Sequence, residues 1–140
     1  MDELNGRKGI TLEEMRDIIQ RSPFNRSLGA EVTVLENGRS ELVVAIRPDL
    51  LQFHGYVHGA IVGCVADNAC AWAAASVLGG VVTAEYTLHF MAPAVGEFLI
   101  GRGEVVKATR RRAVTRAEIF VRSNGEERLV ATAMATIMPV

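Results

Sequence analysis

The chain is short of the residues that would build a disulfide framework, and its charge is balanced. Its two cysteines, Cys64 and Cys70, lie six positions apart on a predicted helix and nearly on opposite sides of it. That spacing suits neither a mutual disulfide nor a metal pair, so we interpret them as small buried thiols in a reducing compartment. The formal net charge is −1, whereas a dedicated nucleic-acid binder normally has a strong basic excess. We expect no nucleic-acid partner.

Signals of several other protein classes are also absent from the sequence. The first residues are charged and polar, without the apolar segment of a signal peptide, so a cytoplasmic location is the default expectation. There is no Ser-centred nucleophile elbow and no phosphate-binding glycine loop, and no cofactor is expected. His54 and His58 lie four apart, but Gly55 replaces the glutamate of the zinc-protease motif and no third ligand is evident, so we expect no metal.

The composition that remains is that of one globular domain. Hydrophobic residues make up 49% and charged residues 22% of the 140-residue chain, and no internal repeat or low-complexity segment interrupts it. We therefore expect a single domain over residues 1–140, with residues 1–10 loosely held. A domain of this size buries about 68–70% of its unfolded surface, which is enough for a proper core.

Hydrophobic periodicity predicts an α+β fold in the order helix, two strands, long helix, four strands. Thr11 and Glu14 form a capping-box pattern at the start of the first helix, which ends before Pro23. Asn37-Gly38 and Asn124-Gly125 are hairpin signals, and Gly79-Gly80 ends the long helix. The predicted helices cover residues 12–21 and 59–78, and the predicted strands cover residues 30–35, 41–46, 81–90, 98–108, 112–122 and 129–138.

The predicted long helix contains one charged residue, Asp67, among small and apolar neighbours. Twenty apolar residues can span a membrane, but an Asp at the bilayer centre costs about 2.5–3.5 kcal/mol, and the segment has no aromatic belt or basic anchor. We expect a buried helix in a protein with no membrane partner. A mostly antiparallel sheet of about six strands must then wrap around this helix to cover its own apolar face.

The strand after this helix has period-2 alternation, which predicts one buried face formed by Val82, Ala84, Tyr86, Leu88 and Phe90. Strict alternation places Thr83 on the opposite face. Unless the start of the strand is distorted, Thr83 is then only structural.

Three segments together resemble the PaaI-type acyl-CoA thioesterases, which have the hot dog fold. The resemblance covers residues 27–138 in element order. Its signature is a His-Gly-Gly at the start of the central helix, an Asp within that helix, and a strand that ends in an aromatic-x-x-Pro. The matching segments are residues 52–60 (QFHGYVHGA), 66–68 (ADN) and 83–93 (TAEYTLHFMAP).

The start of the long helix also has chemistry of its own. The NH groups of Gly59 and Ala60 lie in its first turn, where they have no helical carbonyl partner and carry the positive end of the dipole. They could stabilise a carbonyl oxygen that becomes an oxyanion, and Gly59 lets a substrate approach the backbone closely. Asp67 could attack a thioester carbonyl as nucleophile or activate water as general base. The alternative for Asp67 is a purely structural polar anchor.

Gly59 and Asp67 lie about 12 Å apart along the helix, too far to engage one carbonyl carbon. If both act, Asp67 meets the helix start of another subunit, and two antiparallel helices about a two-fold axis give two equivalent sites. The resemblance implies the same homodimer, which can assemble further as a dimer of dimers.

The resemblance implies further candidate residues. Gln52 stands where these enzymes have an Asn. Thr83 stands where relatives have a Ser or Thr that assists the reaction. His58 joins the catalytic candidates, although we favour a helix-capping or packing role for it. Ala60 replaces the second Gly of the motif but keeps its backbone NH. We include it among the substrate-binding candidates with Asn68, the neighbour of Asp67.

A basic cluster lies at a predicted turn between two strands, where relatives have a Gly-Arg. Its members could bind the phosphates of coenzyme A through charge-assisted hydrogen bonds, or they could be a solvated hairpin tip. The cluster consists of Lys107, Arg110, Arg111 and Arg112.

The sequence favours a hydrolase acting on the thioester of a small, medium or aromatic acyl-CoA. Two alternatives remain open, a hot dog acyl-CoA dehydratase or hydratase and a non-catalytic acyl-CoA-binding module. The position of Asp67 inside the helix favours hydrolysis.

Overall fold

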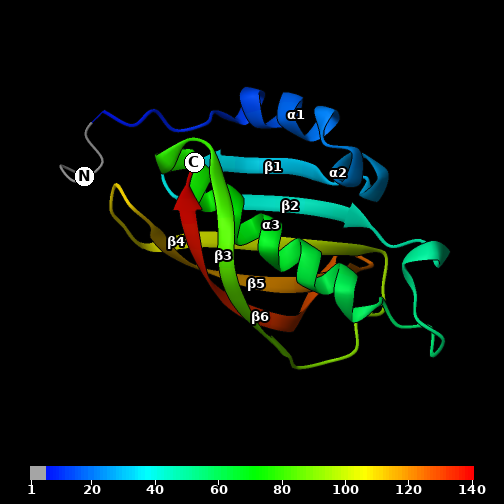
Figure 1. The fold of residues 1–140 in the computed structure, drawn as a ribbon. Coiled ribbons are helices and arrows are strands. Elements are labelled where there is room, and N and C mark those ends of the chain that lie inside the picture. Colours follow the sequence, from blue (N-terminus) through cyan, green and yellow to red (C-terminus); the bar gives the residue numbers. More distant parts are fainter. Residues whose placement is uncertain (1–5) are drawn as a thin grey trace.

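The structure, a computed structural model, describes residues 6–140, which form one six-stranded sheet and three α-helices (Figure 1). A short 3₁₀ helix, Pro48–Leu50, precedes the longest helix. The helices are α1 (Leu12–Arg21), α2 (Pro23–Leu28) and α3 (Gly59–Leu78). The strands are β1 (Glu31–Glu36), β2 (Arg39–Ala45), β3 (Val81–Phe90), β4 (Phe98–Ala108), β5 (Ala113–Ser123) and β6 (Glu126–Pro139).

The sheet is antiparallel throughout, in the order β1-β2-β4-β5-β6-β3. Figure 1 shows it curving around α3, as predicted for a sheet with one apolar helix to cover it. Both hairpin signals are confirmed, because Asn37-Gly38 and Asn124-Gly125 each have positive φ at both residues. The α+β arrangement predicted from the sequence is therefore confirmed.

Small residues on both elements bring α3 close to β4. A Cβ atom added at Gly103 would lie 2.1 Å from the carbonyl oxygen of Ala69, and one at Gly101 would lie 2.7 Å from Val65 Cγ1. Ala69 itself is fully buried. Helix α3 is long and apolar enough to cross a membrane by length and composition, but here it is enclosed by the sheet as a core helix.

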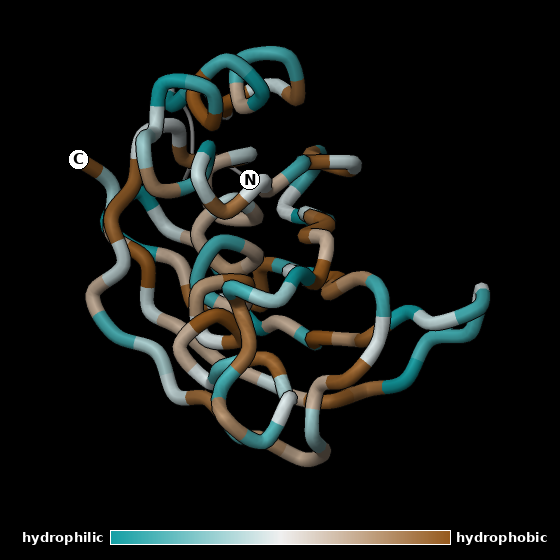
Figure 2. Tube along the Cα trace, turned by 90° about the vertical axis from the view of Figure 1, so that its right-hand side faces the viewer, coloured by the Kyte–Doolittle hydropathy of each residue, from teal (hydrophilic) through white to brown (hydrophobic). Residues whose placement is uncertain are grey.

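The N-terminal segment packs on the end of α3 and continues into α1. The predicted capping box at Thr11 and Glu14 is present, and α1 buries Met15 and Ile19. In Figure 2, hydrophilic and hydrophobic residues alternate along α1, as expected for a surface helix. Residues 1–10 were expected to be loose, yet the Ile10 NH bonds the Ala75 carbonyl, and Gly9 lies against the backbone of Ser76. For residues 1–5 that expectation lies outside the described residues.

Helix α2 was not predicted from the sequence. The sequence predicts that the first helix ends before Pro23, which it does. Pro23 then occupies the first position of a second helix, where its missing NH costs no hydrogen bond. Arg47 donates to the carbonyls of Ser27 and Leu28 and so caps the far end of α2.

Strand β3 departs from strict alternation. Thr83 is paired with Ile137 and Glu85 with Thr136, so Ala84 is an extra residue in a β-bulge. The bulge turns Thr83 toward α3, on the same face as the residues that follow it. The predicted buried face is also wrong for the single chain, because β3 is an edge strand. Its exposed side chains include Val82 at 53%, Tyr86 at 41% and Phe90 at 59%.

Candidate active site

Asp67 lies half-buried in the middle of α3, facing the start of β3. The hydroxyl of Thr83 donates a hydrogen bond to Asp67 Oδ1 over 2.6 Å. Within residues 6–140 this is the one side-chain hydrogen bond that Asp67 makes, so its Oδ2 has no protein donor there. The carboxylate is therefore oriented by one neighbour and keeps an oxygen for water or substrate, which does not fit a fully satisfied structural anchor.

The first turn of α3 offers one free NH rather than two. His58 Nδ1 accepts a hydrogen bond from the Ala60 NH over 2.9 Å and caps the helix. His58 therefore caps the helix, as favoured from the sequence, and the Ala60 NH, predicted to bind substrate, donates to His58 in this structure. Among the described residues the Gly59 NH has no acceptor.

Gly59, Gly63 and Asp67 follow one another at intervals of four along α3 and lie against β3. A Cβ at Gly59 would lie 3.2 Å from Phe90 Cζ, and one at Gly63 would lie 3.1 Å from the Tyr86 hydroxyl. Helix α3 and β3 thus run side by side in opposite directions, with Thr83 at Asp67 and Phe90 at Gly59. Eight residues of helix still separate Gly59 from Asp67 by about 12 Å.

A cavity of about 460 Å³ adjoins Gly59 and is lined mainly by apolar residues. Its size and lining suit a small or medium acyl group. Gln52 also lines it, but Gln52 Oε1 accepts from the His54 NH and braces the preceding loop. Most of the wall comes from the two segments singled out in the sequence, residues 52–60 and 83–93, while Val62 and Val130 were not predicted. The wall residues include Tyr56, Val62, Phe90, Met91, Pro93 and Val130.

A larger hollow, about 680 Å³, lies on the outer face of the sheet and includes neither Asp67 nor Gly59. Several of its charged residues are engaged in ion pairs. Arg102 bonds Glu41 over 2.7 Å and Glu127 over 2.6 Å, and Arg116 pairs with Glu104. The smaller cavity is the one that adjoins a free NH.

Two polar residues near Asp67 are not available for its chemistry. Asn68 Nδ2 donates to Asn25 Oδ1 over 2.8 Å and ties α3 to α2. Because consecutive helical residues point about 100° apart, Asn68 faces α2 rather than the Asp67 side of α3, and its substrate-binding role stays a prediction. Burial, and then the charge of Asp67, raise the pKa of Cys64 to about 11. Cys64 is therefore a neutral thiol at pH 7 and a poor nucleophile.

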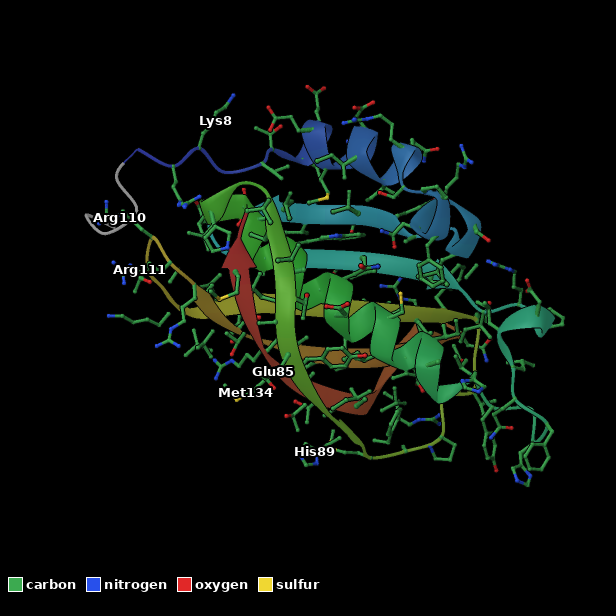
Figure 3. The ribbon with its side chains drawn as sticks, viewed as in Figure 1. Lys8, Glu85, His89, Arg110, Arg111 and Met134 are labelled. Atoms are coloured by element: carbon green, nitrogen blue, oxygen red, sulfur yellow. The ribbon has the colours of Figure 1, made fainter. Side chains whose placement is uncertain are left out.

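The basic cluster lies at the exposed β4–β5 connection. Figure 3 shows Arg110 and Arg111 at the end of the molecule where α3 ends, opposite the end where α3 begins. Within one chain the cluster is therefore remote from Gly59. Among the described residues, no ion pair is formed by Lys107, Arg110, Arg111 or Arg112.

Comparisons with known proteins agree with this architecture. The family model described as "Thioesterase superfamily" matches residues 54–128. A thioesterase family protein from Silicibacter pomeroyi has 40% identity and a TM-score of 0.84, covering 88% of this chain and 93% of that one. A comparison with curated proteins gives no match.

Two solved PaaI structures are also similar. A mutant of the phenylacetic acid degradation protein PaaI from Thermus thermophilus has 29% identity and a TM-score of 0.75, covering 85% of this chain and 100% of that one. PaaI from the E. coli phenylacetic acid degradation operon has 19% identity and a TM-score of 0.83, covering 91% of both chains, and supports the fold alone. The chain belongs to the thioesterase superfamily and is a hot dog thioesterase of the PaaI type.

Proposed function

We propose that the protein hydrolyses acyl-CoA thioesters to the free acid and coenzyme A, with Asp67 as the catalytic carboxylate and the Gly59 NH as the oxyanion donor. The observation that carries this proposal is the presence of two groups with unsatisfied hydrogen-bonding capacity on one face of α3. Asp67 is oriented by Thr83 yet keeps a free oxygen, and the Gly59 NH lies free beside an apolar cavity.

The chemistry follows from these two groups. With Asp67 as general base, its carboxylate removes a proton from water as the water oxygen attacks the thioester carbon. The carbonyl oxygen becomes an oxyanion held by the Gly59 NH, and collapse expels the coenzyme A thiolate, which recovers the proton from Asp67. With Asp67 as nucleophile, its oxygen displaces the thiolate to form an anhydride, which water then cleaves. Both routes need the same two groups.

We propose a cytoplasmic homodimer as the active unit, which can pair again as a homotetramer. The distance of about 12 Å along α3 between Gly59 and Asp67 supports a shared site, because one chain cannot bring both to one carbonyl carbon. Antiparallel α3 helices about a two-fold axis bring the Asp67 of each chain to the Gly59 of the other. The exposed apolar edge at β3 supports the same arrangement.

Asp67→Ala tests the assignment of the carboxylate. On a panel of acyl-CoA substrates, thiol release should fall by about 10²- to 10⁴-fold, while binding of a non-hydrolysable acyl-CoA analogue should persist. Cys64→Ser, on the same helix, is the matched control and should retain turnover. Unchanged turnover in Asp67→Ala would remove Asp67 from the mechanism. Binding without turnover by the wild-type chain, across the whole panel, would favour an acyl-CoA-binding module instead.

A further inference from the structure

The loop that precedes α3, residues 51–58, presents an aromatic ring to solvent. Phe53 is 91% exposed, more than any other large hydrophobic residue of the described chain. In Figure 1 this loop extends from the end of the molecule where α3 begins. We infer that Phe53, with the His54 ring beside it, is the binding site for the adenine ring of coenzyme A. The inference rests on the proposed function and adds a subsite to it.

Hydrogen bonds within the loop hold it in one shape. The Gln52 NH donates to the Tyr56 carbonyl over 2.8 Å, and the Gly55 NH donates to the Gln52 carbonyl over 2.9 Å. Gln52 Oε1 also accepts from the His54 NH, and an isolated β-bridge closes the base of the loop. Phe53 is therefore carried by a braced turn, so a ligand that binds its ring has little loop entropy to overcome.

Three aromatic rings lead from the cavity to the tip of the loop. Tyr56 lines the cavity beside Gly59. The centroid of the His54 ring lies 6.1 Å from that of Tyr56 and 4.0 Å from that of Phe53. A ligand whose acyl group occupies the cavity can therefore extend along an aromatic surface toward Phe53.

The chemistry of an acyl-CoA matches this arrangement. The pantetheine arm and the pyrophosphate separate the thioester from adenine, so the base cannot share the cavity with the reacting carbonyl and must bind at the surface. Adenine is planar and has a π face. Stacking on an aromatic side chain holds such a base without hydrogen bonds to its edges, and Phe53 supplies an open ring face for this contact.

A protein partner fits the tip of the loop less well than a single base does. A stable protein interface buries about 800 Å² on each partner, whereas the tip offers one ring on a narrow turn. The immediate neighbours of that ring along the chain are Gln52 and His54, both of which carry polar groups. The size of the exposed ring therefore favours a ligand with one planar group.

The proposed dimer brings phosphate-binding groups to the same end of the molecule. The basic cluster lies at the end where α3 finishes, opposite the end where α3 begins. In an antiparallel pair of α3 helices, the partner's basic cluster therefore lies at the end from which residues 51–58 extend. The phosphates of coenzyme A adjoin its adenosine, so one region of the dimer offers groups for both.

Binding of free coenzyme A to the purified protein tests the adenine site without turnover. Phe53→Leu keeps an apolar side chain but removes the ring, so the dissociation constant from calorimetry should rise about tenfold, the loss of one stacked base. Phe53→Trp keeps a ring and should retain the affinity. Phe24→Leu, at another exposed phenylalanine, on α2, is the matched control and should bind like the wild type.

A truncated ligand and a spectroscopic signal separate the base from the rest of coenzyme A. Phosphopantetheine has no adenine, so the wild type and Phe53→Leu should bind it equally. In proton NMR spectra of coenzyme A, the ring protons of adenine should shift upfield on binding to the wild type, because they lie over the Phe53 ring. Phe53→Leu should abolish this shift.

Several outcomes would overturn the adenine site. These are no binding of coenzyme A to the wild type, equal affinities of the wild type and Phe53→Leu, and an equal loss of affinity for phosphopantetheine. If Phe53→Leu dissociates an oligomer in sedimentation velocity and leaves the affinity unchanged, the ring contacts a second copy instead.

Thioester turnover is measured separately, so that the two proposals can fail independently. Phe53-dependent binding of coenzyme A without hydrolysis of any acyl-CoA would overturn the proposed function and leave the adenine site. Asp67-dependent hydrolysis with binding that does not depend on Phe53 would overturn only the adenine site.

Discussion

The Thr83 hydroxyl reaches Asp67 because one extra residue, Ala84, interrupts the alternation of β3. Thr83 Oγ1 lies 2.6 Å from Asp67 Oδ1, although alternation alone would turn the threonine to the opposite face. Bulges are frequent next to active sites because they redirect a side chain. Here the bulge supplies the one hydroxyl that orients the central carboxylate.

Replacing the threonine tests this orientation. Thr83→Val removes the hydroxyl and keeps the shape, so kcat should fall by about tenfold, the equivalent of one hydrogen bond of about 1.4 kcal/mol, with KM little changed. Thr83→Ser should retain most of the activity, because the donor is kept. Steady-state kinetics on one acyl-CoA separates the two effects. A rise in KM at constant kcat in Thr83→Val would instead assign Thr83 to substrate binding.

The elements of this fold were largely predictable because its signals are local. The α3 bounds follow from an apolar run ended by Gly79, and both hairpins follow from Asn-Gly pairs. The bulge at Ala84 has no comparable local signal, since it is fixed by the pairing of β3 with β6. Helix α2 was missed for a different reason, because a proline that ends one helix can also begin the next.

The sequence predicts Asp67 and the start of α3 as parts of the candidate site, but it does not predict which neighbouring polar groups are already hydrogen-bonded. Asp67 is conspicuous as the one charge in α3, and the helix start follows from the same segment. The occupied Ala60 NH and the contact between Asn68 and α2 depend on side-chain directions, which the sequence does not specify. The Gly59 NH differs from the Ala60 NH because the His58 side chain caps only the latter.

The basic cluster should contribute to binding of the coenzyme A part of the substrate and not to binding of the acyl group. Replacing Arg110, Arg111 and Arg112 together by Gln should raise KM for an acyl-CoA, because charge-assisted contacts with its phosphates are lost. KM should stay the same for the corresponding N-acetylcysteamine thioester, which has no phosphates. The ratio of the two KM values is the measurement. Equal KM changes, or none, would identify the cluster as a solvated hairpin tip.

The close packing of β4 on α3 predicts a large penalty at Gly103. In Gly103→Ala the new methyl group would lie 2.1 Å from the Ala69 carbonyl, so helix and strand must separate. We expect the free energy of unfolding to fall by about 3 kcal/mol, at the upper end for overpacking. Gly125→Ala is the control, since it has a positive φ but nothing within 4 Å, and it should cost about 1–2 kcal/mol. Urea denaturation measures both, and equal losses would contradict the packing argument.

The ion pairs on the outer face of the sheet should make the free energy of unfolding depend on pH in the acid range. The hydrogen bond from Arg102 lowers the pKa of Glu127 to about 2. Burial acts in the opposite direction but more weakly, and a second hydrogen bond, from Arg122, lowers the pKa further. Because this pKa is depressed on folding, the ionised Glu127 stabilises the protein above its ordinary pKa of 4.5, and this stabilisation is lost as the pH falls toward 2. Urea denaturation between pH 5.5 and pH 3 should therefore show a shallower loss of unfolding free energy for Glu127→Gln than for the wild type. Glu126→Gln, at a neighbouring carboxylate with no ion pair among the described residues, should keep the wild-type slope. Equal slopes for all three proteins would mean that the ion pairs at Glu127 contribute nothing to folding in acid.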